Sequence, residues 1–128
     1  MLVVAQDGAV YITRPSPGDV LMLRDADGDG KADERKLVAK KSQAHGSAIH
    51  DGMMYLATVK AVYAANISEA GTLGNLRTII NNLPNGDEHA NRRLGFGPDG
   101  MLYITVSSTG EASLEMNPKK CRDSSRRC

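Results

Sequence analysis

Residues 7–13 of the chain read Asp-Gly-Ala-Val-Tyr-Ile-Thr, and the phrase returns at 51–57 as Asp-Gly-Met-Met-Tyr-Leu-Ala and at 99–105 as Asp-Gly-Met-Leu-Tyr-Ile-Thr. The Asp-Gly pairs are 44 and 48 residues apart. Each pair is a hairpin-turn signal, because glycine tolerates positive φ and the aspartate side chain bonds the local backbone. The apolar, aromatic and β-branched residues that follow each pair predict a short buried strand.

Other short apolar segments surround each repeated phrase. One precedes every turn, and in the first repeat two more follow, at residues 20–23 and 36–38. Four strands in 44 to 48 residues is the size of one propeller blade. We therefore predict an all-β fold, a β-propeller fragment of about two and a half four-stranded blades. An unrelated pair of hairpins in a small sandwich is the alternative.

The repeat divides the chain into four parts. Residues 1–40 are expected to form blade 1, with an acidic loop at 25–36, residues 41–86 blade 2, and residues 87–118 part of blade 3. Residues 119–128 are polar and basic, and we expect a disordered tail there. Because a propeller closes by joining its last blade to its first and usually needs four to eight blades, we expect the chain to be cut short.

Composition narrows the function. The 128 residues include 16 basic and 15 acidic side chains, a formal charge of +1, which gives no electrostatic reason to expect nucleic acid as a partner. No apolar run approaches the roughly 20 residues that span a bilayer, and no signal peptide is recognisable at the start. Cys121 and Cys128 lie in the tail, where a disulfide would constrain only the tail, so their redox state and role stay open.

Residues 25–34 form the sharpest local motif, Asp-Ala-Asp-Gly-Asp-Gly-Lys-Ala-Asp-Glu. Carboxylates at relative positions 1, 3, 5 and 9 and glycine at position 6 match the front of an EF-hand-type loop. Position 12 is Lys36 and not the usual glutamate, which Asp33, Glu34 or a water would have to replace. We predict a calcium site; an acidic, solvated turn is the alternative. The predicted metal residues are Asp25, Asp27, Asp29, Lys31 at position 7, and Asp33.

A second polar cluster precedes the third repeated phrase. Glu88, His89 and Arg93 lie in a loop that would enter an innermost strand, and such loops open onto the central channel of a propeller. A histidine beside a carboxylate and an arginine could act as a general base; a solvated polar loop is the alternative. His45 holds a comparable place before the second phrase, with a packed turn residue as its alternative. His50, next to the Asp-Gly turn, is assigned no role.

These phrases together resemble one known family. Residues 88–103, Glu-His-Ala-Asn-Arg-Arg-Leu-Gly-Phe-Gly-Pro-Asp-Gly-Met-Leu-Tyr, are similar to the quinoprotein glucose/sorbosone dehydrogenase family, as are Tyr11–Pro15, Gly18–Val20 and the acidic loop after a strand. The resemblance covers roughly residues 1–118. It implies a six-bladed propeller that binds pyrroloquinoline quinone (PQQ) in its channel, commonly with calcium, and that oxidises sugars or aldoses.

The resemblance also implies roles for individual residues. His89 falls on the family's general base, which takes the proton of the substrate hydroxyl while hydride passes to the quinone. Glu88, where soluble glucose enzymes have aspartate, would help to orient the base or the substrate. Arg93 falls on a family arginine; it and His45 are the predicted substrate- or cofactor-binding residues.

The same resemblance sets limits. The basic residues of later blades that hold the quinone carboxylates, and the cofactor calcium ligands, are missing, so we expect this chain to be inactive by itself. The loop at 25–34 is a different site from the cofactor calcium. Family members are usually periplasmic or secreted. The substrate and the electron acceptor cannot be read from the sequence.

Two other functions compete with the dehydrogenase. A calcium-dependent sugar lactonase would use the same architecture, with Asp87, Glu88 and Asn91 as partial ligands, but it leaves the phrase from His89 to Leu94 unexplained. A non-catalytic propeller module would bind a partner through exposed strand edges. Self-association through those open edges is possible in either case.

Overall fold

The computed structural model describes residues 1–84 and 92–105, and within them every regular element is a β-strand. Two antiparallel four-stranded sheets follow one another in the chain, and two further strands form a third, smaller sheet. The sheets comprise β1 (Leu2–Val4), β2 (Val10–Arg14), β3 (Asp19–Arg24) and β4 (Glu34–Lys40); β5 (Gly46–His50), β6 (Met53–Ala57), β7 (Val62–Asn66) and β8 (Arg77–Ile80); and β9 (Arg93–Phe96) with β10 (Leu102–Thr105). The predicted all-β propeller fragment is confirmed. The described part of the chain contains no helix that could cross a membrane.

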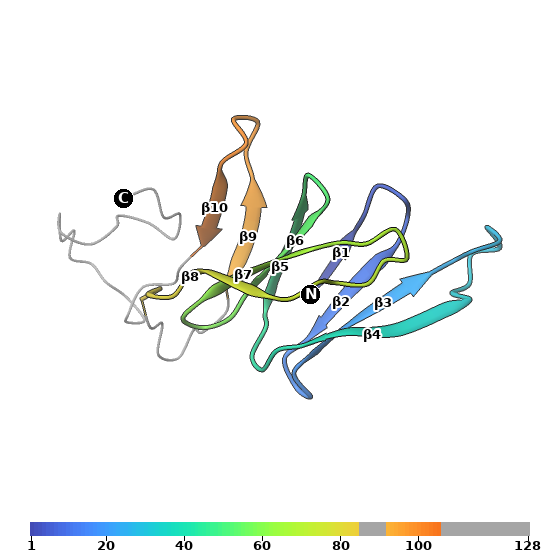
Figure 1. Cartoon of the computed structure of the whole chain (residues 1–128), viewed down its shortest axis with the longest axis horizontal. Coiled ribbons are helices and arrows are strands. Elements are labelled where there is room, and N and C mark those ends of the chain that lie inside the picture. Colours follow the sequence, from blue (N-terminus) through green and yellow to red (C-terminus); the bar gives the residue numbers. More distant parts are fainter. Residues whose placement is uncertain (85–91, 106–128) are drawn as a thin grey trace, which may run out of the picture.

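The three sheets stand side by side along the long axis of the molecule (Figure 1). Within each four-stranded sheet the spatial order of the strands follows their order in the chain. The first strand of each sheet lies next to the first strand of its neighbour, β1 beside β5 and β5 beside β9. This arrangement is that of propeller blades, whose first strands surround a common axis.

The repeated Asp-Gly phrase forms equivalent turns in the first and third sheets. The amide of Ala5 donates to the carbonyl of Ala9 at 2.8 Å, and the amide of Gly97 donates to that of Met101 at 3.0 Å. The aspartate closes each turn, because Asp7 accepts from the Ala9 amide and the corresponding carboxylate of Asp99 from the Met101 amide, both at 3.1 Å. The sequence repeat is thus also a repeat of hydrogen bonds.

The second copy of the phrase makes a tighter turn. His50 pairs directly with Met53, so only Asp51 and Gly52 connect the two strands. Both have positive φ, 49° and 71°, as a two-residue hairpin loop with a type I′ turn requires. A side chain at position 52 would be strained there, which explains why glycine occupies it.

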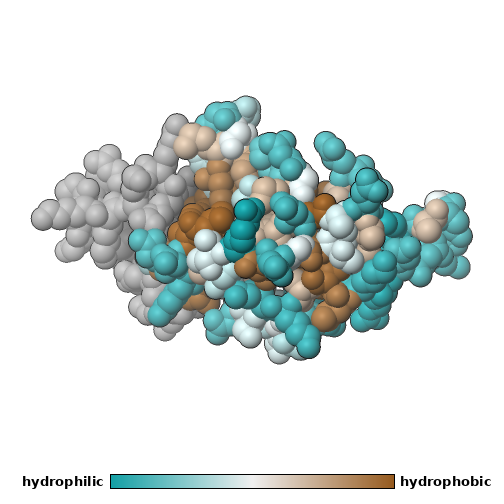
Figure 2. All heavy atoms as spheres, in the orientation of Figure 1, coloured by the Kyte–Doolittle hydropathy of each residue, from teal (hydrophilic) through white to brown (hydrophobic). Residues whose placement is uncertain are grey.

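The hydrophobic core lies between the sheets and not within one of them. Tyr11 and Met22 from the first sheet pack against Met54 and Leu56 from the second, and all four are fully buried. A second cluster joins Val62 and its neighbours in the second sheet to Ile104 on β10. Figure 2 shows hydrophobic residues gathered along the middle of the molecule and hydrophilic residues at its right-hand end. Burying one such large side chain contributes roughly 1.5–3 kcal/mol, so the contacts between sheets hold the blades together.

Candidate functional site

The acidic loop connects β3 to β4. Its base is closed by the amide of Asp33, which donates to the carbonyl of Arg24 at 2.9 Å. Four carboxylates offer oxygens that all lie within 4.8 Å of one another, and all four side chains are exposed: Asp25, Asp27, Asp29 and Asp33. Calcium binds oxygens at about 2.3–2.6 Å, so ligands on opposite sides of one ion are about 4.8 Å apart. The oxygens therefore have the spacing that one calcium ion requires.

Asp25 organises the interior of this loop. One of its carboxylate oxygens accepts from the amide of Gly28 at 2.7 Å, and the other accepts from the amide of Gly30 at 2.8 Å. The bond from Gly30 is the main cause that holds the pKa of the Asp25 carboxyl below its usual range. The loop is thus folded around an ionised carboxylate. Lys31, whose side chain is an ammonium with no acceptor, could ligate a cation only through its backbone carbonyl.

The histidine and arginine predicted to bind substrate or cofactor lie at one end of two adjacent first strands. His45 comes just before β5, is half-buried, and donates its backbone amide to the carbonyl of Ala57 at 2.9 Å. Arg93 opens β9 with an exposed side chain, and its amide donates to Thr105 Oγ1 at 3.1 Å. The structure therefore brings both residues to the same end of neighbouring blades.

Gly46 sets how closely these two strands approach. A Cβ atom built on Gly46 would lie only 2.4 Å from the carbonyl oxygen of Arg92 and 3.3 Å from the Cα of Arg93. Cβ atoms do not come that close to backbone oxygens, so any side chain here would force β5 and β9 apart. Glycine at this position fixes the spacing of the ends that carry His45 and Arg93.

Arg92 is a structural residue that the sequence did not reveal. Arg92 is only 1% exposed, and its Nη2 donates to the carbonyl of Pro84 at 2.7 Å. Burial lowers the pKa of this guanidinium. The hydrogen bond links the two residues that flank positions 85–91. In the sequence Arg92 is one of two consecutive arginines, and nothing in the pattern shows which of them is buried.

The predicted catalytic pair, Glu88 and His89, lies outside the described residues. The alternative lactonase ligands Asp87 and Asn91 lie outside them as well. What the structure describes is the frame on either side: the end of the second sheet at Pro84, and β9 with Arg92 before it.

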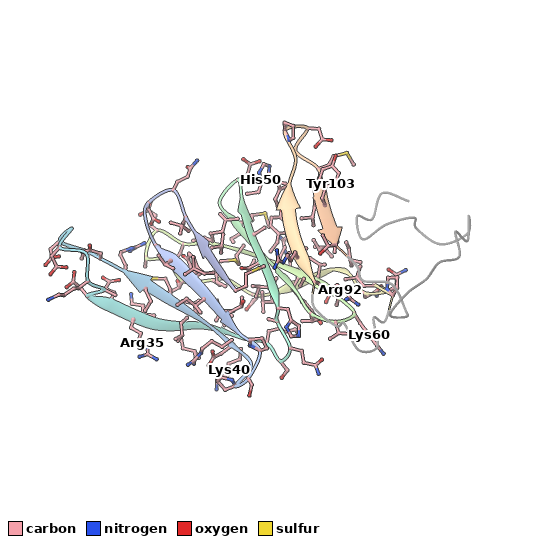
Figure 3. All side chains as sticks on the ribbon, turned by 180° about the vertical axis from the view of Figure 1, so that it is seen from behind. Arg35, Lys40, His50, Lys60, Arg92 and Tyr103 are labelled. Atoms are coloured by element: carbon pink, nitrogen blue, oxygen red, sulfur yellow. The ribbon has the colours of Figure 1, made fainter. Side chains whose placement is uncertain are left out.

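His50, for which the sequence predicts no role, joins two sheets. Its ring stacks on Phe96 with centroids 4.2 Å apart and an interplanar angle of 10°. Tyr55 packs against the same phenylalanine at 4.9 Å. His50 lies at the opposite end of the sheets from Arg92 in Figure 3. It is therefore a structural contact at the end of the sheets opposite to Arg92.

Solved structures with a similar fold include proteins from Trichoderma reesei and Coprinopsis cinerea. A calcium structure and an iodide structure of a Trichoderma reesei protein of Carbohydrate-Active Enzymes Family AA12 are each 25% identical over 85% of this chain, with TM-scores of 0.72 and 0.71. The holo form of the pyranose dehydrogenase PQQ domain from Coprinopsis cinerea is 18% identical over 88% of this chain, with a TM-score of 0.76.

The match covers only part of those proteins. This chain spans 29% and 30% of the two Trichoderma reesei chains and 28% of the Coprinopsis cinerea chain. No curated protein sequence matched it. One family model matches all of residues 1–128, and its description is a domain of unknown function, DUF7133. The chain therefore belongs to the DUF7133 family.

Proposed function

We propose that this chain is part of a PQQ-dependent sugar oxidoreductase of the sugar- or aldose-dehydrogenase type. The observation that carries the proposal is the blade arrangement, with its first strands side by side, shared over 85% of the chain with the AA12 protein. The PQQ domain of pyranose dehydrogenase supports the fold of such a fragment. The proposed substrates are sugars or aldoses of the glucose or sorbosone type.

We propose that the residues at the shared end of β5 and β9 contribute to the cofactor site. PQQ carries carboxylates, and the exposed guanidinium of Arg93 is the kind of group that binds a carboxylate with paired hydrogen bonds. His45 offers a half-buried imidazole at the same end. When bound, the quinone would supply the hydride acceptor, and the protein would supply position and proton transfer.

His89 is proposed as the general base and Glu88 as the group that orients it. The base would take the proton of the sugar hydroxyl, a contribution of about 10²- to 10⁴-fold in rate. Both residues belong to the segment whose flanks are linked by the bond from Arg92 to Pro84. We propose that this bond fixes where the segment starts and ends, which makes Arg92 a positioning residue.

The isolated chain is proposed to be inactive, because it spans less than a third of the solved PQQ domain to which it is similar. We further propose that it self-associates. β1 leaves one edge unpaired within the described sheets, and Leu2 and Val4 on it are 59% and 55% exposed. Unpaired edges with apolar side chains favour pairing with another chain. We also propose a periplasmic or secreted location, because the sequence resembles the quinoprotein glucose/sorbosone dehydrogenase family, whose members are usually found there.

The acidic loop is proposed as a structural calcium site. It connects β3 to the outer strand β4, whereas the proposed catalytic end lies at the start of β5 and β9. Calcium there would stabilise the blade and would not touch the substrate. The proposal is supported by the spacing of the four carboxylates and by the ionised state of Asp25.

Dye reduction with added PQQ, calcium and a panel of aldoses tests the proposed residues. The assay should use this chain extended to the full length of its gene, which we call the extended protein. His89→Ala should lower kcat by about 10²-fold or more, as expected for loss of a general base. His50→Ala is the control, because His50 lies at the end of the sheets opposite to Arg92. It should leave kcat within about twofold of the wild-type value. Equal activity of the His89→Ala protein and the wild type would exclude His89 as the base.

A further inference from the structure

A hollow of about 630 Å³ lies between the first two sheets, apart from the acidic loop. Three segments line it: the hairpin between β2 and β3, the linker between β4 and β5, and the hairpin between β6 and β7. Figure 3 shows two of its residues, Lys40 and Lys60, on one edge of the molecule. We call it the lysine groove.

The lysine groove is lined by cations without matching anions. Lys40, Lys41 and Lys60 line it, and no aspartate or glutamate does. Within the described residues none of these lysines takes part in an ion pair. The nearest carboxylate in register is Asp19, opposite Lys40 on the neighbouring strand. Arg14 binds both oxygens of that carboxylate, at 2.6 Å each. Besides these hydrogen bonds, the charge of Lys40 also helps to lower the pKa of the Asp19 carboxyl, so this one carboxylate, shared with Arg14, offsets the positive charge of the groove only in part.

The remaining lining residues indicate what kind of anion would fit. A volume of 630 Å³ falls in the range of pockets that hold organic ligands, roughly 300–1,000 Å³, and far exceeds one inorganic ion. The hydroxyl of Thr58 is buried and already bonded to the backbone of Ala61, so we do not count it as a ligand-binding group. Ser42 contributes an exposed hydroxyl and Gln43 contributes an amide. These groups both donate and accept hydrogen bonds, as the hydroxyls of a sugar do.

The one aromatic ring in the groove is already covered. The Lys41 Nζ lies 3.8 Å from the centroid of the Tyr63 ring. A cation over the face of a ring leaves little room for a flat base to stack on that face. The groove therefore favours a ligand rich in hydroxyls over a nucleotide.

We propose that the lysine groove binds an anionic saccharide, a short sugar chain that carries carboxylate groups. The lysines would hold the carboxylates, and the hydroxyl and amide side chains would contact the ring hydroxyls. The inference is independent of the proposed oxidoreductase activity, because such binding needs neither PQQ nor an electron acceptor.

Titration calorimetry on the 128-residue chain tests the inference, with the trimer of galacturonic acid as the probe and the neutral galactose trimer as its match. The charged trimer should bind and the neutral trimer should bind at least tenfold more weakly. The double variant Lys40→Gln/Lys60→Gln should weaken binding about tenfold, since each exposed charge contact is worth less than tenfold alone. Raising the salt concentration should weaken binding further.

Lys36→Gln is the matched control, because Lys36 lies on β4 away from the groove and is also an exposed lysine. It should bind the trimer as the wild type does. Equal binding of the two trimers, or unchanged affinity of the double variant, would overturn the proposal. Displacement by inorganic phosphate or sulfate at the same concentration as the trimer would also overturn it, since the groove would then recognise a bare anion. Lys40 and Lys60 are exposed, and an unchanged melting temperature would show that the double variant is folded.

Discussion

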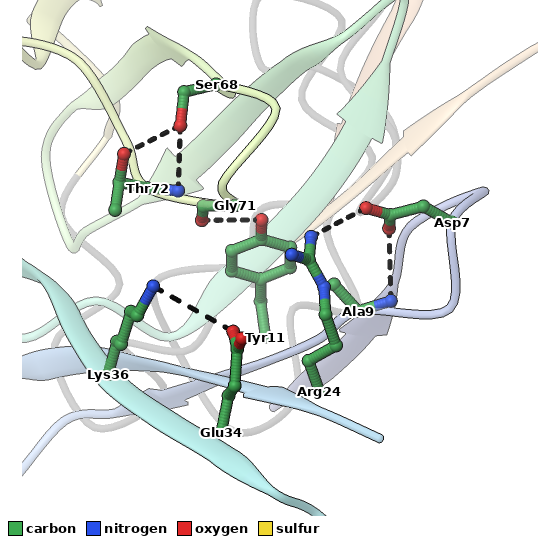
Figure 4. Close-up of polar contacts among 9 residues, drawn as sticks. All are labelled: Asp7, Ala9, Tyr11, Arg24, Glu34, Lys36, Ser68, Gly71 and Thr72. Atoms are coloured by element: carbon green, nitrogen blue, oxygen red, sulfur yellow. Dashed lines mark hydrogen bonds and ion pairs between the residues drawn. The ribbon is translucent and has the colours of Figure 1, made fainter. Parts of the chain in front are cut away.

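The hydroxyl of Tyr11, on β2 of the first sheet, donates a buried hydrogen bond of 2.7 Å to the backbone carbonyl of Gly71, in the connection between β7 and β8 of the second sheet (Figure 4). The two residues are 60 positions apart in the chain. Burial, with Asp7 nearby, raises the pKa of the Tyr11 phenol, so the hydroxyl keeps its proton and remains a donor. One polar contact in a hydrophobic interface therefore fixes the position of the second blade on the first.

Removing this hydroxyl should cost stability. In Tyr11→Phe the buried carbonyl of Gly71 loses the hydrogen bond that it accepts from Tyr11. We therefore expect the free energy of unfolding to fall by about 1–3 kcal/mol. Urea unfolding followed by circular dichroism measures it. Tyr55→Phe is the control, because among the described residues the Tyr55 hydroxyl bonds only to Met53 Sδ, at the long distance of 3.9 Å. If both variants lose the same stability, the bond to Gly71 has no special role.

Gly46 should tolerate no side chain. Gly46→Ala places a Cβ 2.4 Å from the Arg92 carbonyl oxygen, so β9 must move. A loss of about 1–3 kcal/mol is expected from forcing extra atoms into a packed site. Gly95→Ala, on β9 itself, is the matched control, because a Cβ there meets nothing within 4 Å. Similar melting temperatures for the wild type and Gly46→Ala would contradict the close approach of the two strands.

The pair of Arg14 and Asp19 should make stability depend on pH. The hydrogen bonds from Arg14 are the main cause that lowers the pKa of the Asp19 carboxyl below 3.8. A lowered pKa in the folded state stabilises the protein above pH 3.8, and this contribution is lost as the pH falls through the lowered value. Asp19→Asn should therefore melt below the wild type at pH 7, and the difference should shrink towards pH 3.

The exposed Glu69 serves as the control for this pH series. The free energy of unfolding of Glu69→Gln should lie within about 0.5 kcal/mol of the wild-type value at each pH, as is usual for substitutions at exposed positions. A gap between Asp19→Asn and the wild type that stays constant from pH 7 to pH 3 would show that the ion pair is not its cause.

Calcium should raise the melting temperature of the chain. A ligand that binds only the folded state stabilises it by about 2.7 kcal/mol at a concentration of 100 times the Kd. In the wild type the Lys31 amide donates to Asp29 Oδ1 at 2.8 Å. Asp29→Asn keeps an oxygen that can accept this bond but removes one negative charge from the site. It should bind calcium at least tenfold more weakly. Asp51→Asn, an exposed aspartate on another turn, should bind as the wild type does, and a melting temperature indifferent to calcium would exclude the site.

The repeated phrase predicts the fold well, because hairpins depend on local chemistry. The hydrogen bonds that the carboxylates of Asp7 and Asp99 accept come from backbone amides only two positions further along the chain. The spacing of carboxylates in the acidic loop likewise belongs to one short segment, and the structure brings Asp25, Asp27, Asp29 and Asp33 together.

Contacts between blades could not be predicted in this way. The bond from Tyr11 to Gly71 and the stack of His50 on Phe96 join residues with no shared pattern in the sequence. Arg92 is buried, and its backbone carbonyl lies close to Gly46 of the neighbouring sheet, which only the assembled sheets show. The shifts in strand register at Val20 and at Val62 were not expected from the alternation of side chains either.

The most direct test of the central claim is dye reduction by the extended protein, measured with and without PQQ beside hydrolysis of a sugar lactone. The account predicts sugar-dependent dye reduction only when PQQ is added, no lactone hydrolysis, and no dye reduction by the 128-residue chain alone. Lactone hydrolysis without PQQ, together with no dye reduction for any sugar, would contradict the assignment and identify a hydrolase on the same fold.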